Sequence, residues 1–306
     1  MRTSILDILR AKETGRKLSM LTAYDSTMAA IIDSIGIDMI LVGDSAGNVM
    51  LGYDNTIPVT MDDMIRFTAA VVRSTKNSFI IGDMPFMSYE VSVEDAVRNA
   101  GRFIKEGRAM AVKLEGGNEM SSQISAIIDA GIPVCGHLGL TPQSIHKFGG
   151  HKVQARSAAA ANRLIEDALA LQDAGIFLLV LECIPWQIAK LVTERVSIPT
   201  IGIGAGPFCD GQVLVTQDML GLYDSFKPRF LKHFGRIREH IVEALSKYKH
   251  EVLEGIFPSP EYSYDMPEDE MEKLLEETPS YAFFYQSDSK STQITPKRVA
   301  DAKNGK

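Results

Sequence analysis

The chain has 306 residues, of which 45% are hydrophobic and 23% are charged, a composition typical of a soluble globular protein. This length suits either two ordinary domains or one α/β barrel. The net charge of −7, without a Lys/Arg-rich run before the last few residues, argues against a role on nucleic acid or on a membrane surface.

The first segment of the chain is not a targeting sequence. MRTSILDILRAKETGRK is charged throughout and contains no long apolar core, so it does not have the pattern of a signal peptide. Within it, SILDILRAKE predicts a helix that precedes the first strand. We therefore expect a cytoplasmic protein.

Short runs rich in Val, Ile and Leu then recur through the first 220 residues. Continuous apolar runs of this length are typical of strands that are buried on both faces, as in a parallel sheet. In chain order the runs are KLSMLTAYD, DMILVGDS, SFIIGDMP, AVKLEGG, IPVCGHLG, FLLVLEC, IPTIGIGAG and QVLVTQD.

Helical patterns lie between most of these runs. STMAAIIDSIGI is the first. MDDMIRFTAAVVRSTKN follows Thr60, with Asp63 three residues on to complete a capping box. VEDAVRNAGRFIKEG follows an N-cap at Ser92 and stops near Gly107.

This alternation of strands and helices predicts an α/β protein with a (β/α)8 barrel, an N-terminal helix at its bottom and a last outer helix within residues 227–255. Between IGIGAG and QVLVTQD there is room for a turn but not for a helix, so the pattern alone also leaves a doubly wound sheet open. After about residue 264 the sequence becomes acidic, then polar and basic. We predict a catalytic barrel over 1–263 and a partly disordered C-terminal extension over 264–306.

Several of the predicted strands end on a polar residue. In AVKLEGG, Lys113 and Glu115 fall on the same side of the strand, because side chains alternate along it. In a barrel the strand ends meet at one mouth, where active sites are built, so residues far apart in sequence become neighbours. The strand-end residues are Asp44, Asp83, Glu115, His137 and Glu182.

Three carboxylates at one mouth would raise one another's pKa values, and a cation resolves that conflict. Oxygen ligands without a cluster of His or Cys favour a hard ion such as Mg²⁺. We therefore predict a metal site at Asp44, Asp83 and Glu115, with a water between Glu115 and the ion as one option. Taken singly, Asp83 could instead cap the turn before Pro85, and Asp44 could be an ordinary loop residue.

The other polar residues of this mouth suit an anionic substrate. Lys113 is predicted to pair with the carboxylates or to hold the substrate, with a Schiff-base lysine as the alternative. Glu182 is the candidate general base, with a structural salt bridge as the alternative. His137 is predicted to donate to a substrate oxygen unless its role is structural. The residue pattern by itself predicts no more than a metal-assisted abstraction of a proton next to a carbonyl group.

Cysteines and glycines point to no further cofactor. Cys135, Cys183 and Cys209 show neither CxxC spacing nor matching histidines, which predicts buried, reduced thiols. IGIGAG lacks the following helix and the downstream acid of a dinucleotide site. Phosphate binding near the seventh strand stays open.

From about Ser4 to Tyr262 the sequence resembles the ketopantoate hydroxymethyltransferase family, also called 3-methyl-2-oxobutanoate hydroxymethyltransferases, whose fold is a (β/α)8 barrel. The motifs occur in order over most of the chain and are highly specific. They are LTAYD, LVGDSAGNVMLGYDNTIPVT, DMPFMSY, VKLEGG, PVCGHLGLTPQS, FGGHKVQAR, LLVLECIP and IGIGAG followed by DGQVLV.

The resemblance implies roles for the residues of the mouth. The family's metal-binding acids fall on Asp44, Asp83 and Glu115. Its keto-acid contacts fall on Ser45, Asp83 and Lys113. The resemblance further implies Mg²⁺, 5,10-methylenetetrahydrofolate as co-substrate, and a homo-oligomer, which is a decamer in the family.

Two further residues match the family pattern and one departs from it. The family's proton acceptor falls on Glu182, and His137 matches a histidine that lines the family's pocket. In GNVMLGYDNT, Tyr53 stands where the family pattern has His, in a lid-like loop. The segment after about residue 264 has no counterpart in the family pattern.

The implied reaction transfers a hydroxymethyl group to 3-methyl-2-oxobutanoate and yields 2-dehydropantoate and tetrahydrofolate, on the route to pantothenate. The keto acid would chelate Mg²⁺ through its carboxylate and keto oxygens. Glu182 would remove the C3 proton, and the enolate carbon would attack the methylene group of the folate.

Two alternatives remain at this point. The first is a phosphoenolpyruvate-type lyase or mutase, which also holds an enolate on Mg²⁺ in a barrel, and for which Cys209 after IGIGAG would be the reactive cysteine. The second is an inactive barrel that serves as a binding subunit. The presence of all four acids of the mouth argues against the second alternative.

Overall fold

The computed structural model describes residues 2–150, 152–223 and 228–281. The chain divides into two compact units, Met1–Ile237 and Arg238–Lys306. The boundary between the units lies upstream of the predicted domain boundary at residue 263. The predicted disorder of the C-terminal tail falls on residues 282–306, outside the described part of the chain.

The first unit is a closed barrel of eight parallel strands in sequential order, each paired with the next and β8 with β1. This confirms the predicted (β/α)8 barrel, and every apolar run of the sequence contributes one strand. The strands are β1 (Leu18–Thr22), β2 (Met39–Val42), β3 (Phe79–Asp83), β4 (Ala111–Glu115), β5 (Val134–Gly139), β6 (Leu178–Glu182), β7 (Thr200–Ile203) and β8 (Gly211–Leu214).

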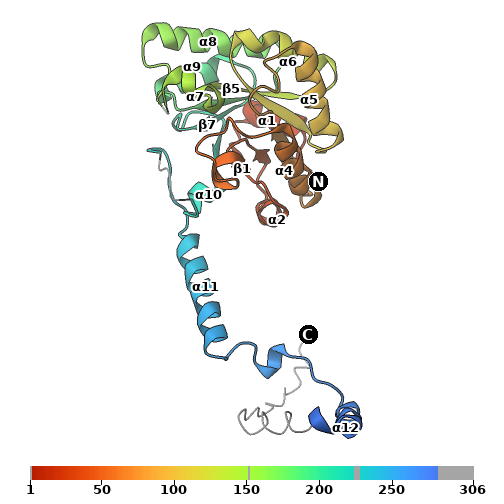
Figure 1. The fold of residues 1–306 in the computed structure, drawn as a ribbon. Coiled ribbons are helices and arrows are strands. Elements are labelled where there is room, and N and C mark those ends of the chain that lie inside the picture. The colour runs from red at the N-terminus through yellow and green to blue at the C-terminus, as the bar shows by residue number, and fades with distance from the viewer. Residues whose placement is uncertain (1, 151, 224–227, 282–306) are drawn as a thin grey trace. The chain divides into compact units, whose positions relative to one another are not determined.

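Helices follow most of the strands and lie outside them, as Figure 1 shows for α4, α5, α6 and α8. The helices of the first unit are α1 (Ile5–Thr14), α2 (Ser26–Ser34), α3 (Ala46–Val49), α4 (Met61–Arg73), α5 (Val93–Lys105), α6 (Ser121–Asp129), α7 (Ile145–Phe148), α8 (Ala158–Asp173), α9 (Trp186–Arg195) and α10 (Thr216–Met219). Two 3₁₀ turns span Asn118–Met120 and Pro142–Ser144.

The predicted helix starts are confirmed by their hydrogen bonds. Thr60 accepts from the backbone N–H of Asp63, whose carboxylate accepts from the N–H of Thr60, so both halves of the capping box form at α4. Ser92 accepts from the N–H of Asp95 at the start of α5. These contacts satisfy N–H groups that have no partner within the first helical turn.

Side chains inside the barrel form one apolar cluster that is closed at the bottom by α1. Every second residue of the strands faces inward, because side chains alternate. Ile8 and Ala11 of α1 pack against this cluster, which confirms the helix predicted at the barrel bottom. The strand members of the cluster are Leu18, Met20, Met39, Leu41, Phe79, Ile81, Ala111, Cys135, Leu178, Val180, Ile201 and Val213.

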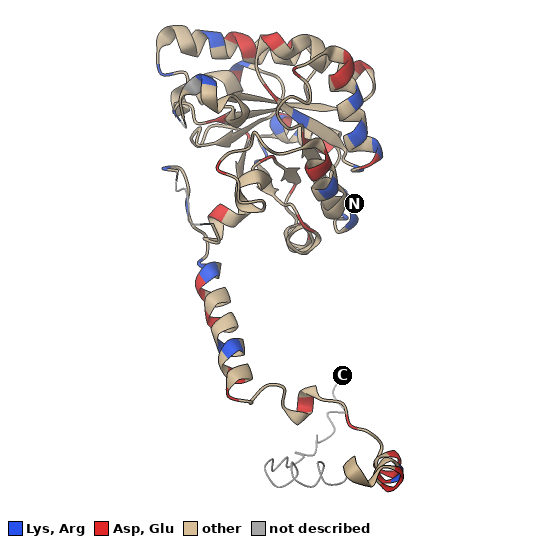
Figure 2. Cartoon of the chain, viewed as in Figure 1, with Lys and Arg blue, Asp and Glu red and all other residues tan. Residues whose placement is uncertain are grey.

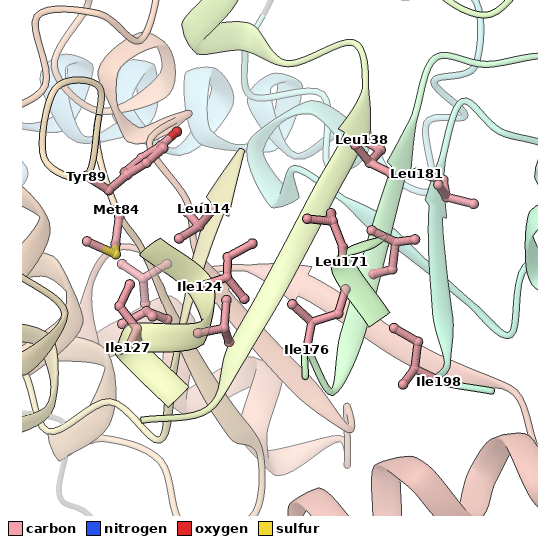
Figure 3. Close-up of a cluster of buried hydrophobic side chains, with 14 of the residues drawn as sticks. Met84, Tyr89, Leu114, Ile124, Ile127, Leu138, Leu171, Ile176, Leu181 and Ile198 are labelled. Carbon is pink, nitrogen blue, oxygen red and sulfur yellow. The ribbon is translucent and has the colours of Figure 1, made fainter. Parts of the chain in front are cut away.

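A second apolar cluster fills the layer between the strands and the outer helices. The strand residues that face outward pack here against the apolar faces of the helices, such as Leu114 of β4 and Ile124 of α6. Figure 3 shows part of this cluster. Since both strand faces are buried, the continuous apolar runs of the sequence are explained.

The connection between β7 and β8 contains no helix, as the short interval in the sequence predicts. The eighth strand is shorter than its run QVLVTQD, because Thr216 already begins helix α10. Thr216 is held to β1 by two hydrogen bonds, from its N–H to Thr22 Oγ1 (3.1 Å) and from its hydroxyl to the Thr22 carbonyl (2.6 Å). The end of QVLVTQD is therefore a rigid helical turn over the barrel mouth.

The second unit is described up to residue 281. Its elements are α11 (Ile237–Leu253), a 3₁₀ turn (Pro260–Tyr262) and α12 (Glu268–Glu277). The helix expected within residues 227–255 is α11; it belongs almost wholly to this unit, and none of its residues is buried. Figure 2 shows the acidic character of α12 and the charged residues along the outer helices of the barrel. Among the described helices, none is long and apolar enough to cross a membrane.

The contact between β3 and α5 offers a stability test. A Cβ at Gly82 would overlap the ring of Phe103, whereas a Cβ at Gly101, on α5, meets nothing. We expect Gly82→Ala to lower the free energy of unfolding by about 1–3 kcal/mol, as overpacking does. Gly101→Ala, the matched control, should raise it by up to about 1 kcal/mol. Urea denaturation measures both, and equal stabilities of the two variants would contradict the packing.

Candidate active site

A cavity of about 540 Å³ opens at the carboxyl ends of the strands, the face where barrels carry their active sites. All the site residues predicted from the sequence line it, although they come from β3 to β6 and from the loop after β2. They are Asp44, Ser45, Asp83, Lys113, Glu115, His137 and Glu182.

The strand register brings these residues together. Asp83 at the end of β3 is level with Lys113 of β4. Glu115 of β4 is level with His137 of β5. Because both pairs fall on inward-facing positions of adjacent strands, each side chain meets one of opposite charge.

The resulting contacts form a continuous chain of charges across four strands. Lys113 Nζ lies 2.6 Å from Asp83 Oδ1 and 3.7 Å from Glu115 Oε1. His137 lies between two acids, with Nδ1 3.3 Å from Glu115 Oε1 and Nε2 3.3 Å from Glu182 Oε2. Acidic and basic groups thus alternate from β3 to β6.

Lys113 is the central cation of this chain and is 3% exposed. Burial acts to lower the pKa of Lys113, but the carboxylates, Asp83 foremost, outweigh burial and raise it. The ammonium is therefore charged at neutral pH. Its ion pairs to two acids leave no neutral amine for a Schiff base, which argues for an electrostatic role.

The three predicted metal ligands differ in their protonation. Burial, followed by repulsion from Asp83 and Glu115, raises the pKa of Asp44 well above its usual range. Burial also raises the pKa of Asp83, against the opposing effect of Lys113. Glu115 is buried as well, yet His137 and Lys113 together lower its pKa. Repulsion between the acids therefore raises the pKa of Asp44 most clearly, because no ion pair between Asp44 and a basic group is found among the described residues.

His137 is held between its two acids as a charged imidazolium. Burial and Lys113 act to lower the pKa of His137, but Glu115 and Glu182 raise it by more, to about 9. Neither ring nitrogen has the alignment of a hydrogen bond, so the attraction is one of charge. The ring is 2% exposed, and its nearest oxygens belong to these acids.

Two residues that sequence reasoning missed orient the acids. The side-chain amide of Gln143 donates to Asp44 Oδ2 and to the carbonyl of Met84, both at 2.9 Å, and its backbone N–H donates to Glu115 Oε2 at 3.0 Å. Tyr89 donates to Gln143 Oε1 at 2.6 Å and accepts from the N–H of Glu115. Both residues lie within motifs of the sequence, PVCGHLGLTPQS and DMPFMSY, but nothing in those motifs marks them as polar residues of the core.

The loop after β2 is tied to the barrel through its backbone and through Ser45. The N–H of Asp44 donates to Asp83 Oδ2 at 3.1 Å. Ser45 Oγ lies 2.9 Å from the hydroxyl of Tyr24, which is buried. Tyr53, the departure from the family pattern, is 39% exposed and does not line the cavity.

Glu182 is followed by an unusual backbone. Cys183 has φ = +48°, a left-handed conformation that is uncommon outside glycine. It is held there by hydrogen bonds from Cys183 N–H to Ile203 and from Gln154 N–H to the Cys183 carbonyl, both at 2.9 Å. Gly139 has φ = +99°, and a Cβ there would overlap the Glu182 carbonyl. Both features fix the direction in which β6 ends.

Gly204 and Gly206 of IGIGAG have no free space beside them for a phosphate. A Cβ at Gly204 would lie 2.6 Å from the ring of Phe230, and one at Gly206 would overlap Trp186. Aromatic side chains therefore fill the space that a phosphate loop leaves to its ligand.

The cysteines also fail to support the mutase alternative. Cys209 is buried, and burial raises its pKa, which disfavours a reactive thiolate. Cys135 is buried, as predicted, while Cys183 is only partly so.

The acids suit a magnesium ion by their chemistry but do not form a closed cage. Within residues 2–150, 152–223 and 228–281, no three acids, histidines or cysteines form a group that could hold a metal by themselves. Mg²⁺ does not need such a cage, because it takes one or two carboxylates and completes its shell with water and substrate. Among the described residues, Glu115 Oε1 has charged neighbours but no aligned hydrogen-bond donor, so both it and the crowded Asp44 are groups that a cation would satisfy.

Comparison with known proteins places the chain in one family. The family model "Ketopantoate hydroxymethyltransferase" matches residues 2–260. A 3-methyl-2-oxobutanoate hydroxymethyltransferase of Syntrophomonas wolfei is 56% identical over 263 residues, 86% of this chain and 95% of that protein. The enzyme of the same name from Clostridium botulinum strain 657 is 55% identical over 274 residues, 90% of this chain and all of that protein.

Solved structures share the fold at low identity. A phosphonopyruvate hydrolase in complex with oxalate and Mg²⁺ covers 91% of this chain and 99% of its own, with a TM-score of 0.57 and 12% identity. A 2,3-dimethylmalate lyase covers 94% of this chain and 100% of its own, with a TM-score of 0.52 and 16% identity. At these identities the likeness concerns the barrel alone.

Removal of the buried ammonium of Lys113 should destabilise the protein. Lys113→Met would leave Asp83 and Glu115 in the core without their cation, so we expect the free energy of unfolding to fall by about 3–5 kcal/mol. Lys190→Met, which removes an exposed pair with Glu194 and a contact of the ammonium with the Phe208 ring, should cost only about 1 kcal/mol. Urea denaturation at pH 7 without metal compares the two. A loss of the same size in both variants would contradict the role of the buried pair.

Proposed function

The chain belongs to the ketopantoate hydroxymethyltransferase family, and we propose that it transfers a hydroxymethyl group from 5,10-methylenetetrahydrofolate to 3-methyl-2-oxobutanoate. The products are 2-dehydropantoate and tetrahydrofolate, and water supplies the hydroxyl oxygen. The observation that carries the proposal is the gathering of the acids and of Lys113 at one barrel mouth, in a chain that matches the family over residues 2–260.

Asp44 and Asp83 are the residues that would hold Mg²⁺ directly, with Glu115 reaching it through a water. When bound, Mg²⁺ supplies a positive charge that stabilises the negative charge developing on the keto oxygen of the substrate. The 2-oxo acid completes the shell that these carboxylates leave open. This explains why the acids need not form a cage before substrate arrives.

Lys113 and Ser45 position the substrate anion. The Lys113 ammonium, fixed by Asp83 at 2.6 Å, places a positive charge in the cavity wall where the substrate carboxylate binds. With Tyr24 as donor to Ser45 Oγ, the Ser45 hydroxyl hydrogen is left for a substrate oxygen. These contacts orient the C3–H bond of the keto acid for removal of its proton.

Glu182 is the base that accepts the C3 proton. Its side chain is 16% exposed at the cavity, and the His137 imidazolium lies 3.3 Å from its Oε2. The imidazolium holds this carboxylate in place before the reaction by charge attraction. The electron pair of the C–H bond moves toward the keto oxygen, and the resulting carbon nucleophile forms the new bond to the folate methylene group as one of its two carbon–nitrogen bonds breaks. The second carbon–nitrogen bond breaks when water adds to the same carbon, so that the hydroxyl stays on the product and the folate nitrogens take up protons to give tetrahydrofolate.

For His137 the contacts favour the structural alternative over a hydrogen bond to a substrate oxygen. Both of its nitrogens face carboxylates, at 3.3 Å, so we assign it to holding Glu115 and Glu182 rather than to donating to a substrate oxygen. The homo-oligomeric state, a decamer in the family, and the cytoplasmic location rest on the family resemblance and on the sequence pattern.

Proton exchange tests the base. In deuterated water with Mg²⁺ and no folate, the protein should exchange the C3 proton of 3-methyl-2-oxobutanoate, which NMR follows directly. Glu182→Gln should slow this exchange by about 10²- to 10⁴-fold, since it removes the general base. Glu194→Gln, an exposed glutamate of α9, is the control and should exchange normally. Undiminished exchange in the Glu182 variant would exclude the residue as base.

Metal binding tests the acids without relying on activity. Mg²⁺ at 100 times its dissociation constant should raise the free energy of unfolding by about 2.7 kcal/mol, and Asp44→Asn should abolish most of this gain. Because the pKa of Asp44 is raised in the metal-free protein, binding should also release protons, which calorimetry in buffers of different ionisation enthalpy detects. Equal stabilisation of the variant and the parent protein would contradict the assignment.

A further inference from the structure

The cavity is lined by apolar as well as charged residues, and we call the apolar residues of its lining the apolar part of the cavity. Its 540 Å³ lies within the range of about 300–1,000 Å³ that is usual for drug-sized ligands, so a five-carbon keto acid leaves room for a larger molecule. This part is formed by the ends of β7 and β8 and by residues 228–231. Its apolar lining includes Ile203, Val213, Leu214, Val215, Phe230 and Leu231.

One acid of this apolar part takes no part in the chemistry described above. Asp218, on α10, lines the cavity, and its Oδ1 atom is buried without a hydrogen-bond partner among the described residues. Burial raises the pKa of Asp218 to about 6, so the carboxylate is mostly ionised at neutral pH. Helix α10 is anchored to Thr22 through Thr216, which holds the acid in place.

A buried, ionised oxygen without a donor is costly, so the site suits a ligand that brings N–H groups. The cation nearest the reaction centre, Lys113, is already paired with Asp83 and Glu115. The cavity that Asp218 lines also carries apolar side chains, which favour a flat ring. The ligand chemistry is therefore a planar heterocycle that carries adjacent N–H donors along one edge.

We propose that Asp218 binds the pterin ring of the folate co-substrate through the N3–H and the 2-amino group of its pyrimidine edge. These two groups present the same parallel N–H fork as a guanidinium, which a carboxylate accepts with both oxygens. The apolar residues of β7, β8 and the segment 228–231 cover the ring. This inference rests on the proposed function and adds the group that recognises the one-carbon carrier.

The charge at the rim of this part agrees with the rest of the folate molecule. Arg229 lines the same cavity and is exposed. The glutamyl tail of folate carries carboxylates that stay in water, where an arginine at the rim attracts them. Asp218 in the cavity and Arg229 at its rim thus match the pterin ring and the glutamyl tail of the ligand.

The test is direct binding of tetrahydrofolate, by calorimetry, to the protein loaded with Mg²⁺ and 3-methyl-2-oxobutanoate. Asp218→Asn and Asp218→Ala should bind about 10- to 100-fold more weakly, the usual loss for hydrogen bonds to a charged group. Asp173→Asn, which removes an exposed acid of α8, should bind as the parent protein does. Unchanged affinity in both Asp218 variants overturns the proposal.

An altered ligand separates recognition from a structural effect. A tetrahydrofolate analogue with methyl in place of the 2-amino group keeps N3–H but lacks the second donor of the fork, so Asp218→Asn should weaken the analogue by a clearly smaller factor than it weakens tetrahydrofolate. If Asp218 only supported the fold, the variant would weaken the analogue and tetrahydrofolate by the same factor, and that outcome overturns the proposal.

Folate-free exchange of the keto-acid C3 proton distinguishes this inference from the proposed function. Asp218 lies outside the exchange chemistry, so its variants should keep the exchange rate within about twofold while folate affinity falls. Absence of exchange in the metal-loaded parent protein contradicts the proposed function itself. Normal exchange with undiminished folate binding in the variants contradicts only the role of Asp218.

Discussion

The pairing of one buried ammonium with the acids of the barrel mouth is the interaction on which the site depends. Lys113 lies 2.6 Å from Asp83 and 3.7 Å from Glu115, and without it the acids would repel one another in a region of low dielectric. The ammonium of Lys113, which the protein holds in place, balances most of this negative charge in the absence of ligands. Asp44, the acid left unbalanced, is the group with most to gain from a second cation.

The barrel supplies the geometry that this balance needs. Parallel strands in register bring Asp83 level with Lys113 and Glu115 level with His137, so opposite charges face each other without long, flexible connections. Gln143 then holds Asp44 by a hydrogen bond, and Tyr89 in turn holds the side chain of Gln143. A preorganised set of charges of this kind stabilises a developing negative charge without reorganising during the reaction. The role we propose for the apolar part of the cavity is to cover a flat co-substrate.

Sequence patterns predicted much of the fold and of the charged centre. The apolar runs that became strands, the capping boxes, and the polar residues at strand ends all depend on local rules that hold wherever such residues occur. The sequence did not predict the roles of Gln143, Tyr89 and Asp218, for different reasons. The first two act through contacts with residues far away in the chain. Asp218 ends QVLVTQD just as other acids end their runs, but it lies within the helical turn α10 and not at a strand end.

What the sequence determined by itself is the order of strands and helices and which acids and which lysine lie near the strand ends, because burial and alternation leave a readable pattern along the chain. Only the tertiary structure decided which groups meet. His137 lies between two carboxylates, and aromatic rings fill the space beside the glycines of IGIGAG. The physical reason is that charge pairing and packing depend on distances across the barrel, and those distances are set by register and closure and not by separation along the chain.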